Sequence, residues 1–257
     1  MKKGKKLSLE IYEISFQRLP KAFDGLKIIN ISDLHNANLK GAIETQLNEV
    51  KPDMIVITGD LISFENYYQN AMKVVEYAVK LAPVFYVNGN HEGRFSKEKY
   101  LEFTSRLKRT GVVVLENQIY HYNRGGEKIA IIGMNDPKFF VGKKKEMFKK
   151  TLKELILSVK DEFKLLLSHR PEFFKVYAEC GVEIALSGHV HGGQIRLPKI
   201  GAFYAPGQGL FPKYADGLKR INDSYMMISR GIGRTFRTPP RILNPRELSL
   251  IILKKLD

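Results

Sequence analysis

Two short segments of the chain pair Asp and His residues at a spacing of two. The segment "SDLHN" places Asp33 and His35 after an apolar run, and "GHVHGG" places His189 and His191 after another. Carboxylates and neutral imidazoles are common ligands of zinc, iron and manganese ions. Either pair alone is equally typical of ordinary loop or core residues. The pairs therefore predict a metal site only if the rest of the chain supplies further ligands.

Similar polar residues follow three other apolar runs. The runs "IINISDLH", "MIVITGD", "VFYVNGNHE", "KLLLSH" and "VEIALSGHVHGG" each end in Asp, Asn or His. Ligands bind at the carboxyl ends of strands in open α/β sheets, so these ends are expected to meet at one site. The donors are oxygen and nitrogen, with no thiolate among them. The predicted metal ligands are Asp33, His35, Asp60, Asn90, His169, His189 and His191.

The spacing of these residues supports a shared site. Residues i and i+2 of an extended chain point the same way, so Asp33 with His35, and His189 with His191, are each expected to face a common point. Seven donors are too many for one tetrahedral ion. We therefore expect two divalent ions about 3.5–4 Å apart, an arrangement used for in-line displacement at phosphorus. Glycines beside the ligands allow sharp turns and close backbone approach: they are Gly59, Gly89, Gly188, Gly192 and Gly193.

Strands alternating with helices must position these residues. Apolar, β-rich runs predict strands at 27–31, 54–57, 84–87, 112–115, 129–132, 163–167, 182–186, 225–228 and 248–253, and alternating apolar residues predict another at 7–14. Helical patterns lie at 41–50, 67–80, 97–108, 144–158 and 171–179. The prediction is one α/β domain over residues 1–257, with two sheets packed together and helices outside.

The composition restricts the class of partner. The chain has 42 Lys and Arg against 27 Asp and Glu, a net charge of +15, which suggests an anionic partner such as a phosphorylated substrate, an anionic membrane surface or nucleic acid. A single cysteine excludes an internal disulfide and favours a reducing compartment. No apolar run approaches the roughly 18 residues of a spanning helix, and no signal peptide is evident. We expect a cytoplasmic protein, with peripheral membrane attachment left open.

The five polar blocks, taken in order, resemble the signature of the calcineurin-like metallophosphoesterase superfamily. The text "GHVHGGQIRLPKIGAFYAPGQG" further resembles the bacterial YkuE/YaeI-type branch, whose members act on phosphodiester or pyrophosphate bonds and in some cases on lipid-linked substrates such as UDP-2,3-diacylglucosamine. The resemblance implies an α/β metallophosphoesterase-type β-sandwich of two mixed sheets flanked by helices. The signature D-x-H, GD, GNH[DE], H and GHxH appears as Asp33-Leu34-His35, Gly59-Asp60, Gly89-Asn90-His91-Glu92, His169 and Gly188-His189-Val190-His191.

The resemblance also implies a role for each polar residue. Asp60 would bridge two ions of Mn, Zn or Fe, and a hydroxide held between them would attack phosphorus. His91 would not bind metal; it would stabilise the transition state or protonate the leaving oxygen. Glu92 is expected to orient a neighbour. The other ligands would divide into two sets: Asp33, His35 and His191 at one ion, and Asn90, His169 and His189 at the other.

Arginines near the site are candidate substrate contacts, together with Asn90. Arg94 and Arg170 follow ligand blocks directly, so we expect both to lie near the site. An Arg-rich segment before the last strand could reach the mouth of the site and hold a second phosphate, or could carry only surface charges. Its arginines are Arg230, Arg234, Arg237 and Arg241.

The sequence therefore predicts a dinuclear metal-dependent phosphohydrolase that cleaves phosphodiester or pyrophosphate bonds, with a nucleotide or phospholipid-type substrate. The alternative is a metal-dependent nuclease, which the charge favours, although no nucleic-acid-binding motif is present. A non-catalytic scaffold would be marked by loss of the ligands or of His91, and none is lost. The expected partner is a phosphorylated small-molecule or lipid substrate. No obligate protein partner is evident.

Overall fold

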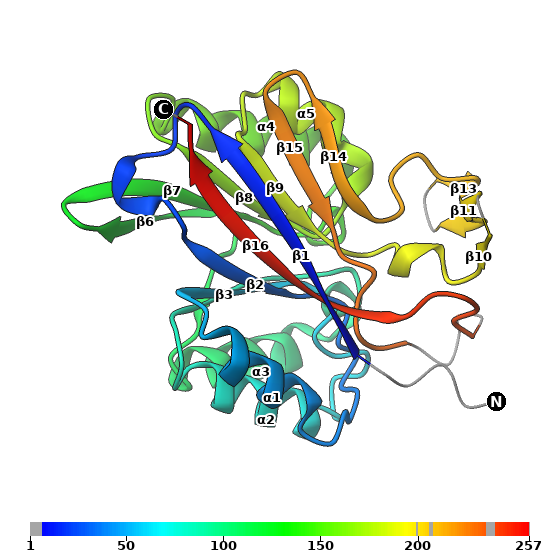
Figure 1. The fold of residues 1–257 in the computed structure, drawn as a ribbon. Helices are drawn as coiled ribbons and strands as arrows, with labels where there is room; N and C mark the ends of the chain where they lie inside the picture. Colours follow the sequence, from blue (N-terminus) through cyan, green and yellow to red (C-terminus); the bar gives the residue numbers. More distant parts are fainter. Residues whose placement is uncertain (1–6, 199, 206–207, 235–239, 257) are drawn as a thin grey trace.

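The computed structural model describes residues 7–198, 200–205, 208–234 and 240–256. Two six-stranded sheets pack face to face, and helices cover their outer faces (Figure 1). Both sheets are mixed, as predicted. The first sheet has the order β1 (Leu7–Phe16), β16 (Arg246–Lys255), β2 (Lys27–Ile31), β3 (Met54–Thr58), β4 (Val84–Val87) and β5 (Val113–Val114). Strands β2 to β5 run parallel, and β16 is antiparallel to β2 but parallel to β1.

The second sheet has a parallel centre with an antiparallel strand at each edge. Its order is β14 (Gly217–Ile221), β15 (Ser224–Ile228), β9 (Ile184–Ser187), β8 (Lys164–Ser168), β7 (Glu127–Met134) and β6 (Gln118–Arg124). Strands β15, β9, β8 and β7 are parallel to one another. The predicted strands therefore occur in both sheets, close to their predicted bounds.

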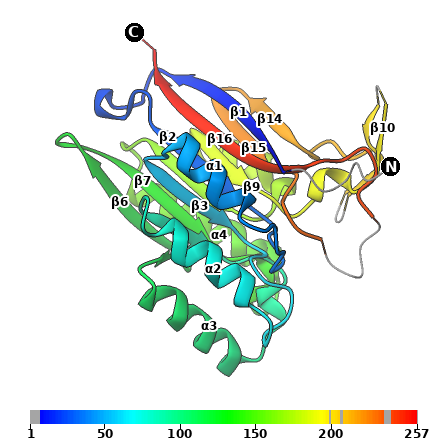
Figure 2. The same ribbon diagram turned by 60° about the horizontal axis from the view of Figure 1, so that its bottom comes forward.

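Helices lie on the outside of each sheet, as Figure 2 shows for the first. The helices α1 (Ala42–Val50), α2 (Gln69–Ala78) and α3 (Lys97–Arg109) cover the first sheet, and α4 (Lys144–Ser158) and α5 (Phe174–Glu179) cover the second. Single 3-10 turns are η1 (Lys21–Phe23), η2 (Glu92–Arg94), η3 (Pro137–Phe139), η4 (Pro171–Phe173) and η5 (His191–Gly193). Among the helices of the described residues, none is both long and apolar enough to cross a membrane.

The core has three layers, because alternate strand residues point to opposite faces of a sheet. Ile28 and Val56 point between the sheets, where they pack with residues of β8 and β9 such as Leu165. Their neighbours Ile29 and Ile55 point the other way and pack against α1 and α2. Both faces of these strands are therefore buried, which explains their continuous apolar runs.

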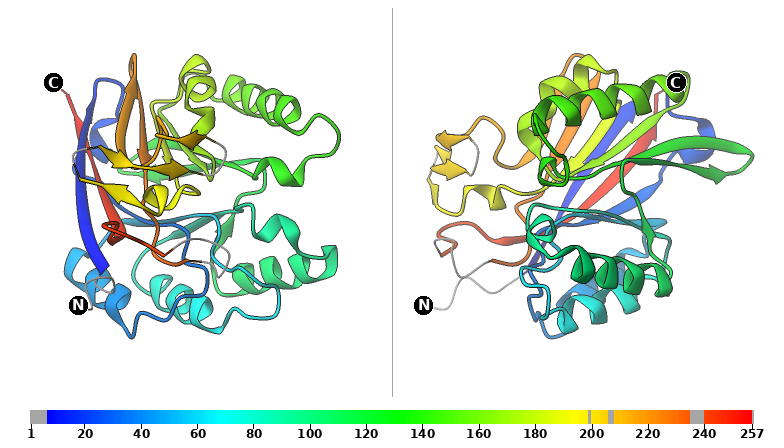
Figure 3. Two further views of the ribbon diagram at one scale, coloured as in Figure 1. Left: turned by 90° about the vertical axis from the view of Figure 1, so that its right-hand side faces the viewer. Right: turned by 180° about the vertical axis from the view of Figure 1, so that it is seen from behind.

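A projecting segment follows β9 and η5 (Figure 3). It contains two antiparallel pairs of two-residue strands, formed by β10 (Arg196–Leu197) with β11 (Gly201–Ala202) and by β12 (Tyr204–Ala205) with β13 (Gly209–Leu210). These pairs belong to neither large sheet. The last third of the chain therefore contains more strand than helix among the described residues.

Candidate metal centre

The predicted polar residues lie where two sets of parallel strands end. Strands β2, β3 and β4 of the first sheet and β8 and β9 of the second each deliver residues at their carboxyl ends. The backbone links these ends: the Asp33 N–H donates to the carbonyl of Gly59, and the His189 N–H donates to the Asp33 carboxylate across the two sheets. The sheet packing therefore gathers ligand candidates that are up to 158 residues apart in sequence, from Asp33 to His191.

The side chains form two groups that share one residue. Within each group, one candidate ligand atom per residue lies within 4.8 Å of the others. Asp60 belongs to both: its Oδ2 lies 3.8 Å from Nε2 of His35 and 3.3 Å from Nε2 of His169. All members are buried. The groups are Asp33, His35, Asp60 and His191, and Asp60, His169 and His189.

Two buried atoms of the site fit metal binding. Among the described residues, Oδ1 of Asn90 and Nδ1 of His189 have no hydrogen-bond partner. A buried polar atom left unpaired costs about 1–3 kcal/mol, so the two together favour a compensating ligand. Oxygen and imidazole donors without thiolate suit manganese, iron or zinc in a catalytic setting.

Burial and neighbouring charges set the protonation states of the cluster. Burial lowers the pKa of His35 and of His191 to about 3, so both rings are neutral and offer lone pairs. Burial also disfavours charge on His169, but the Asp60 carboxylate outweighs it and raises the pKa of His169 to about 10. Burial works against ionisation of Asp60, yet His169 holds its pKa well below the ordinary value. A metal ion would take the place of the His169 proton.

The backbone at the ligands departs from the extended geometry expected from the sequence. Asp33 and His35 both reach the first group, but with φ values of 51° and 49° they lie in a left-handed turn. His191 falls in the first group and His189 in the second. Non-glycine residues in the left-handed region cost of order 1–3 kcal/mol each and cluster at functional sites. The others here are Asp60 at 51°, His189 at 72° and His191 at 48°.

Two glycines let the backbone pass against the ligands. A Cβ at Gly89 would lie 2.2 Å from Oδ1 of Asp60, and one at Gly188 would lie 1.8 Å from Oγ of Ser32, the residue whose hydroxyl donates to the Asp33 carboxylate. Neither contact is sterically possible. The predicted close approach at these glycines is confirmed.

We expect Gly89→Ala to displace the Asp60 carboxylate, because the new methyl group overlaps it. Overpacking of this kind costs about 1–3 kcal/mol in unfolding free energy. Metal content measured by mass spectrometry should fall with it. Gly142→Ala is the control: its φ is 71° but nothing lies within 4 Å of its Cβ, so it should keep its metal. Equal metal content in both variants would contradict the steric argument.

Glu92 holds the loop that carries Asp60. Its carboxylate accepts hydrogen bonds from the backbone N–H groups of Asp60 at 3.1 Å, Ile62 at 3.2 Å and Gly89 at 2.9 Å. Burial and the nearby Asp60 charge raise the pKa of Glu92 to about 7. The structure thus agrees with the prediction that Glu92 orients a neighbour.

Glu92→Gln is expected to destabilise the fold by about 1–3 kcal/mol, since an amide has only one oxygen to accept these three bonds. Thermal unfolding measures this loss. Glu98→Gln on the exposed face of α3 is the matched control and should melt like the parent. A Glu92→Gln protein with an unchanged melting temperature would show that the three bonds contribute no stability.

His91 differs from the predicted ligands in its exposure. Its side chain is 13% exposed, whereas those of His35 and His169 are fully enclosed. Its Nε2 lies 3.8 Å from Oδ2 of Asp60, and its backbone N–H donates to Oδ1 of the same carboxylate at 2.8 Å. His91 therefore lies beside both groups of donors but in neither.

Several residues that position the cluster are not among those predicted from the sequence. Ser63 Oγ lies 2.8 Å from Nδ1 of His35, and the Thr58 carbonyl lies 2.7 Å from Nδ1 of His169. These contacts leave the Nε2 atoms of both rings facing the cluster. Asp136 follows β7 and binds Arg170. The rule of polar residues at strand ends would have found Asp136, but no local signal marks Ser63.

The arginines proposed as substrate contacts occupy different places. Arg170 is taken up inside the protein, where it binds Asp136 and places Nη1 2.9 Å from Nε2 of His189. Arg94 and Arg234 are exposed. In the Arg-rich segment, Arg241 Nη2 lies 3.3 Å from Nδ1 of His191, Arg230 pairs with Glu10 and Glu247, and Arg237 lies outside the described residues.

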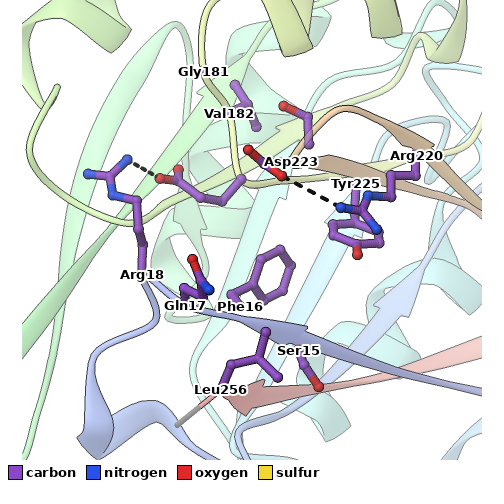
Figure 4. Close-up of a pocket in the computed structure, with 12 residues that line it drawn as sticks. Ser15, Phe16, Gln17, Arg18, Gly181, Val182, Arg220, Asp223, Tyr225 and Leu256 are labelled. Carbon is purple, nitrogen blue, oxygen red and sulfur yellow. Dashed lines mark hydrogen bonds and ion pairs between the residues drawn. The ribbon is translucent and has the colours of Figure 1, made fainter.

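A cavity of about 460 Å³ lies away from this cluster (Figure 4). It is lined by residues such as Phe16, at the end of β1, and Glu183, just before β9 begins, whereas the metal-ligand candidates follow the ends of strands such as β9. Its charges are paired within the wall, Arg18 with Glu183 and Arg220 with Asp223. The cavity is therefore separate from the metal centre.

Comparison with known proteins identifies the family. The profile of the calcineurin-like phosphoesterases matches residues 26–193, which include every candidate metal ligand. The chain belongs to the calcineurin-like phosphoesterase family. This calcineurin-like protein is accordingly a metal-dependent phosphoesterase, and its buried Asp and His cluster is the candidate site for divalent metal.

Two relatives place this calcineurin-like phosphoesterase in the predicted branch. The chain is 32% identical to the uncharacterized metallophosphoesterase YkuE of Bacillus subtilis, covering 96% of this chain and 85% of that protein. It is 27% identical to phosphodiesterase YaeI of Escherichia coli, covering 82% and 77%. Among solved structures, phosphopantetheinyl hydrolase PptH of Mycobacterium tuberculosis has a TM-score of 0.52 at 12% identity, covering 80% and 89%, and supports the fold.

Proposed function

We propose that this protein is a dinuclear phosphodiesterase or pyrophosphatase that acts on a nucleotide or phospholipid-type substrate. The observation that carries the proposal is the position of Asp60, whose carboxylate belongs to both groups of donors. A carboxylate shared between two sets of ligands is what a pair of neighbouring ions requires. The proposal treats residues 1–257 as one domain, since β1 and β16 lie in the same sheet as β2 and β3.

The chain's own residues divide the work in this proposal. The ions, when bound, would supply Lewis-acid polarisation of the phosphate and an activated water nucleophile. Asp33, His35 and His191 would hold one ion. Asn90, His169 and His189 would hold the other, with Asp60 between them.

Other residues in the proposal face the substrate rather than the ions. His91, whose side chain is more exposed than the enclosed rings of His35 and His169, would protonate the leaving oxygen. Exposed Arg94 and Arg234 would bind a charged group beyond the scissile bond. Asn90, which would hold an ion through Oδ1, would contact the substrate through its amide N–H groups. Arg170, already bound to Asp136 and His189, would position those residues instead.

The bond type is inferred from the relatives and from charge. YaeI of Escherichia coli is named a phosphodiesterase, and the net charge of +15 favours a substrate with more than one negative group. The same charge favours a nuclease, which would contact many phosphates and lose affinity steeply as salt rises. Salt dependence therefore separates the two functions.

The experiment is a substrate screen on metal-free protein supplied separately with manganese and with zinc. It compares phosphomonoesters, phosphodiesters, cyclic nucleotides, nucleotide-sugar pyrophosphates, phospholipids and single-stranded DNA. We expect metal-dependent hydrolysis that is fastest for a diester or a pyrophosphate. Preference for DNA with a steep salt dependence would favour the nuclease. Preference for monoesters, or two ions never bound together, would contradict the proposal.

A further inference from the structure

Exposed apolar side chains gather on the projecting segment after the metal centre. Ile200, Leu210 and Phe211 are 64%, 60% and 59% exposed, and Phe203 and Tyr204 between them are also exposed. Phe203 packs edge-on against Phe211, with ring centroids 5.5 Å apart, so the side chains from the two hairpins form one cluster. A cluster of this kind on a protein surface marks an interaction site more often than scattered single residues do.

A second segment extends this cluster. Ile242 and Leu243 are exposed, Leu243 at 67%. The Ile242 N–H donates to the Gln194 carbonyl at 3.1 Å, and the Arg196 N–H donates to the Ile242 carbonyl at 3.0 Å, so this loop is tied to the first hairpin. We call the combined surface the apolar rim. It consists of Ile200, Phe203, Tyr204, Leu210, Phe211, Ile242 and Leu243.

The apolar rim is attached directly to the metal centre. A Cβ at Gly193 would lie 2.4 Å from the Ala202 side chain, so the rim's first hairpin packs tightly on the turn that carries His191. Asn244, next to Leu243, donates to the His191 carbonyl at 2.6 Å. Figure 3 shows the segment projecting from the molecule beside the strand ends. A surface that docks at the rim therefore lies close to the catalytic edge of the sheets.

Exposed basic residues lie on the segments that form the apolar rim. Arg234, which precedes Ile242 in the chain, is exposed. Lys213 is exposed on the projecting segment itself. Positive charge beside exposed Leu, Ile, Phe and Tyr is the composition of proteins that lie on anionic bilayers.

We propose that the apolar rim docks on the surface of an anionic lipid bilayer. Its Leu, Ile and Phe side chains would enter the headgroup region, while the basic residues meet lipid phosphates. Tyr204 fits the interface because its ring is apolar and its hydroxyl polar. The exposed basic residues beside these apolar side chains favour an anionic bilayer as the occupant. The inference concerns binding and goes beyond the proposed reaction.

The test is sedimentation of the full chain with vesicles of phosphatidylcholine alone and of phosphatidylcholine mixed equally with phosphatidylglycerol. The rim variant combines Ile200→Ser, Leu210→Ser and Leu243→Ser. The matched control makes the same changes at Ile11, Leu101 and Leu157, which are 62%, 52% and 70% exposed on β1, α3 and α4. All six positions are exposed, so both variants should fold, and thermal melting checks this.

We expect the parent and the control to bind the mixed vesicles more tightly than the neutral ones. The rim variant should bind the mixed vesicles at least about tenfold more weakly, since three apolar side chains no longer enter the headgroup region. Equal binding by both variants would overturn the proposal. So would a parent that binds neither vesicle, or one that forms a dimer lost only in the rim variant. Because vesicle binding needs no turnover, the result stands apart from the outcome of the substrate screen.

Discussion

Replacement of Asp60 by Asn is expected to lower metal content and turnover together. Oδ2 of Asp60 faces His35 in one group of donors and His169 in the other, so the amide removes negative charge from both. Changes in residues that merely support a ligand typically cost 10–100-fold, so loss of the shared carboxylate should reduce kcat by at least about 100-fold. Mass spectrometry of bound metal and steady-state rates on a phosphodiester measure the two effects.

Asp53→Asn is the matched control for this change. Asp53 lies just before the other end of the same strand, β3, where it accepts from the Lys27 N–H at 2.9 Å and pairs with Arg124 at 3.3 Å. Its replacement should leave metal content and kcat close to those of the parent. An Asp60→Asn protein that binds two ions and turns over at the parent's rate would remove Asp60 from its proposed bridging role.

His91→Ala is expected to keep its metal and lose turnover by about 10²–10⁴-fold, the range for loss of a general acid. His91 belongs to neither group of candidate ligands, yet its Nε2 lies 3.8 Å from the Asp60 carboxylate. Its Nδ1 is buried without a hydrogen-bond partner among the described residues, so no hydrogen bond from Nδ1 fixes the orientation of the ring. The loss should be greatest for substrates whose leaving group needs a proton.

Two substrates and one control variant test this role. A diester with a nitrophenol leaving group needs little protonation and should show the smaller loss, while an alkyl leaving group should show the larger one. His121→Ala, on the edge strand β6 where His121 binds Glu162 at 2.9 Å, should change neither rate nor metal content. The same rate as the parent on the alkyl substrate, or metal lost from His91→Ala, would rule out the acid role.

The positions of most helices and strands could be predicted from the sequence because these elements are buried in a layered core. Continuous apolar runs such as 27–31 and 84–87 correspond to strands buried on both faces, and the helix at 144–158 has its predicted bounds. The helix predicted at 171–179 is instead the turn η4 followed by α5. The pattern of apolar residues marks which faces are buried, and burial determines where these helices and strands form. The placement of the ligand candidates at strand ends followed from the same pattern.

The local geometry of the ligands could not be predicted in the same way. The sequence predicted an extended backbone at His189 and His191, but both residues have left-handed φ values, and they fall in different groups of donors. Asp and His enter this conformation more often than other non-glycine residues do, but still rarely, so residue type alone does not predict it. Contacts distant in sequence, such as Ser63 with His35 and Arg241 with His191, leave no local pattern either.

The last strand of the chain has a consequence for biosynthesis. β16 lies between β1 and β2, so it pairs with segments that leave the ribosome more than 200 residues earlier. Until residues 246–255 emerge, β1 has no neighbour and one side of β2 is an open edge. Pairings this distant in sequence form slowly, since a long loop must close first. The nascent protein must therefore protect an incomplete sheet until residues 246–255 have emerged.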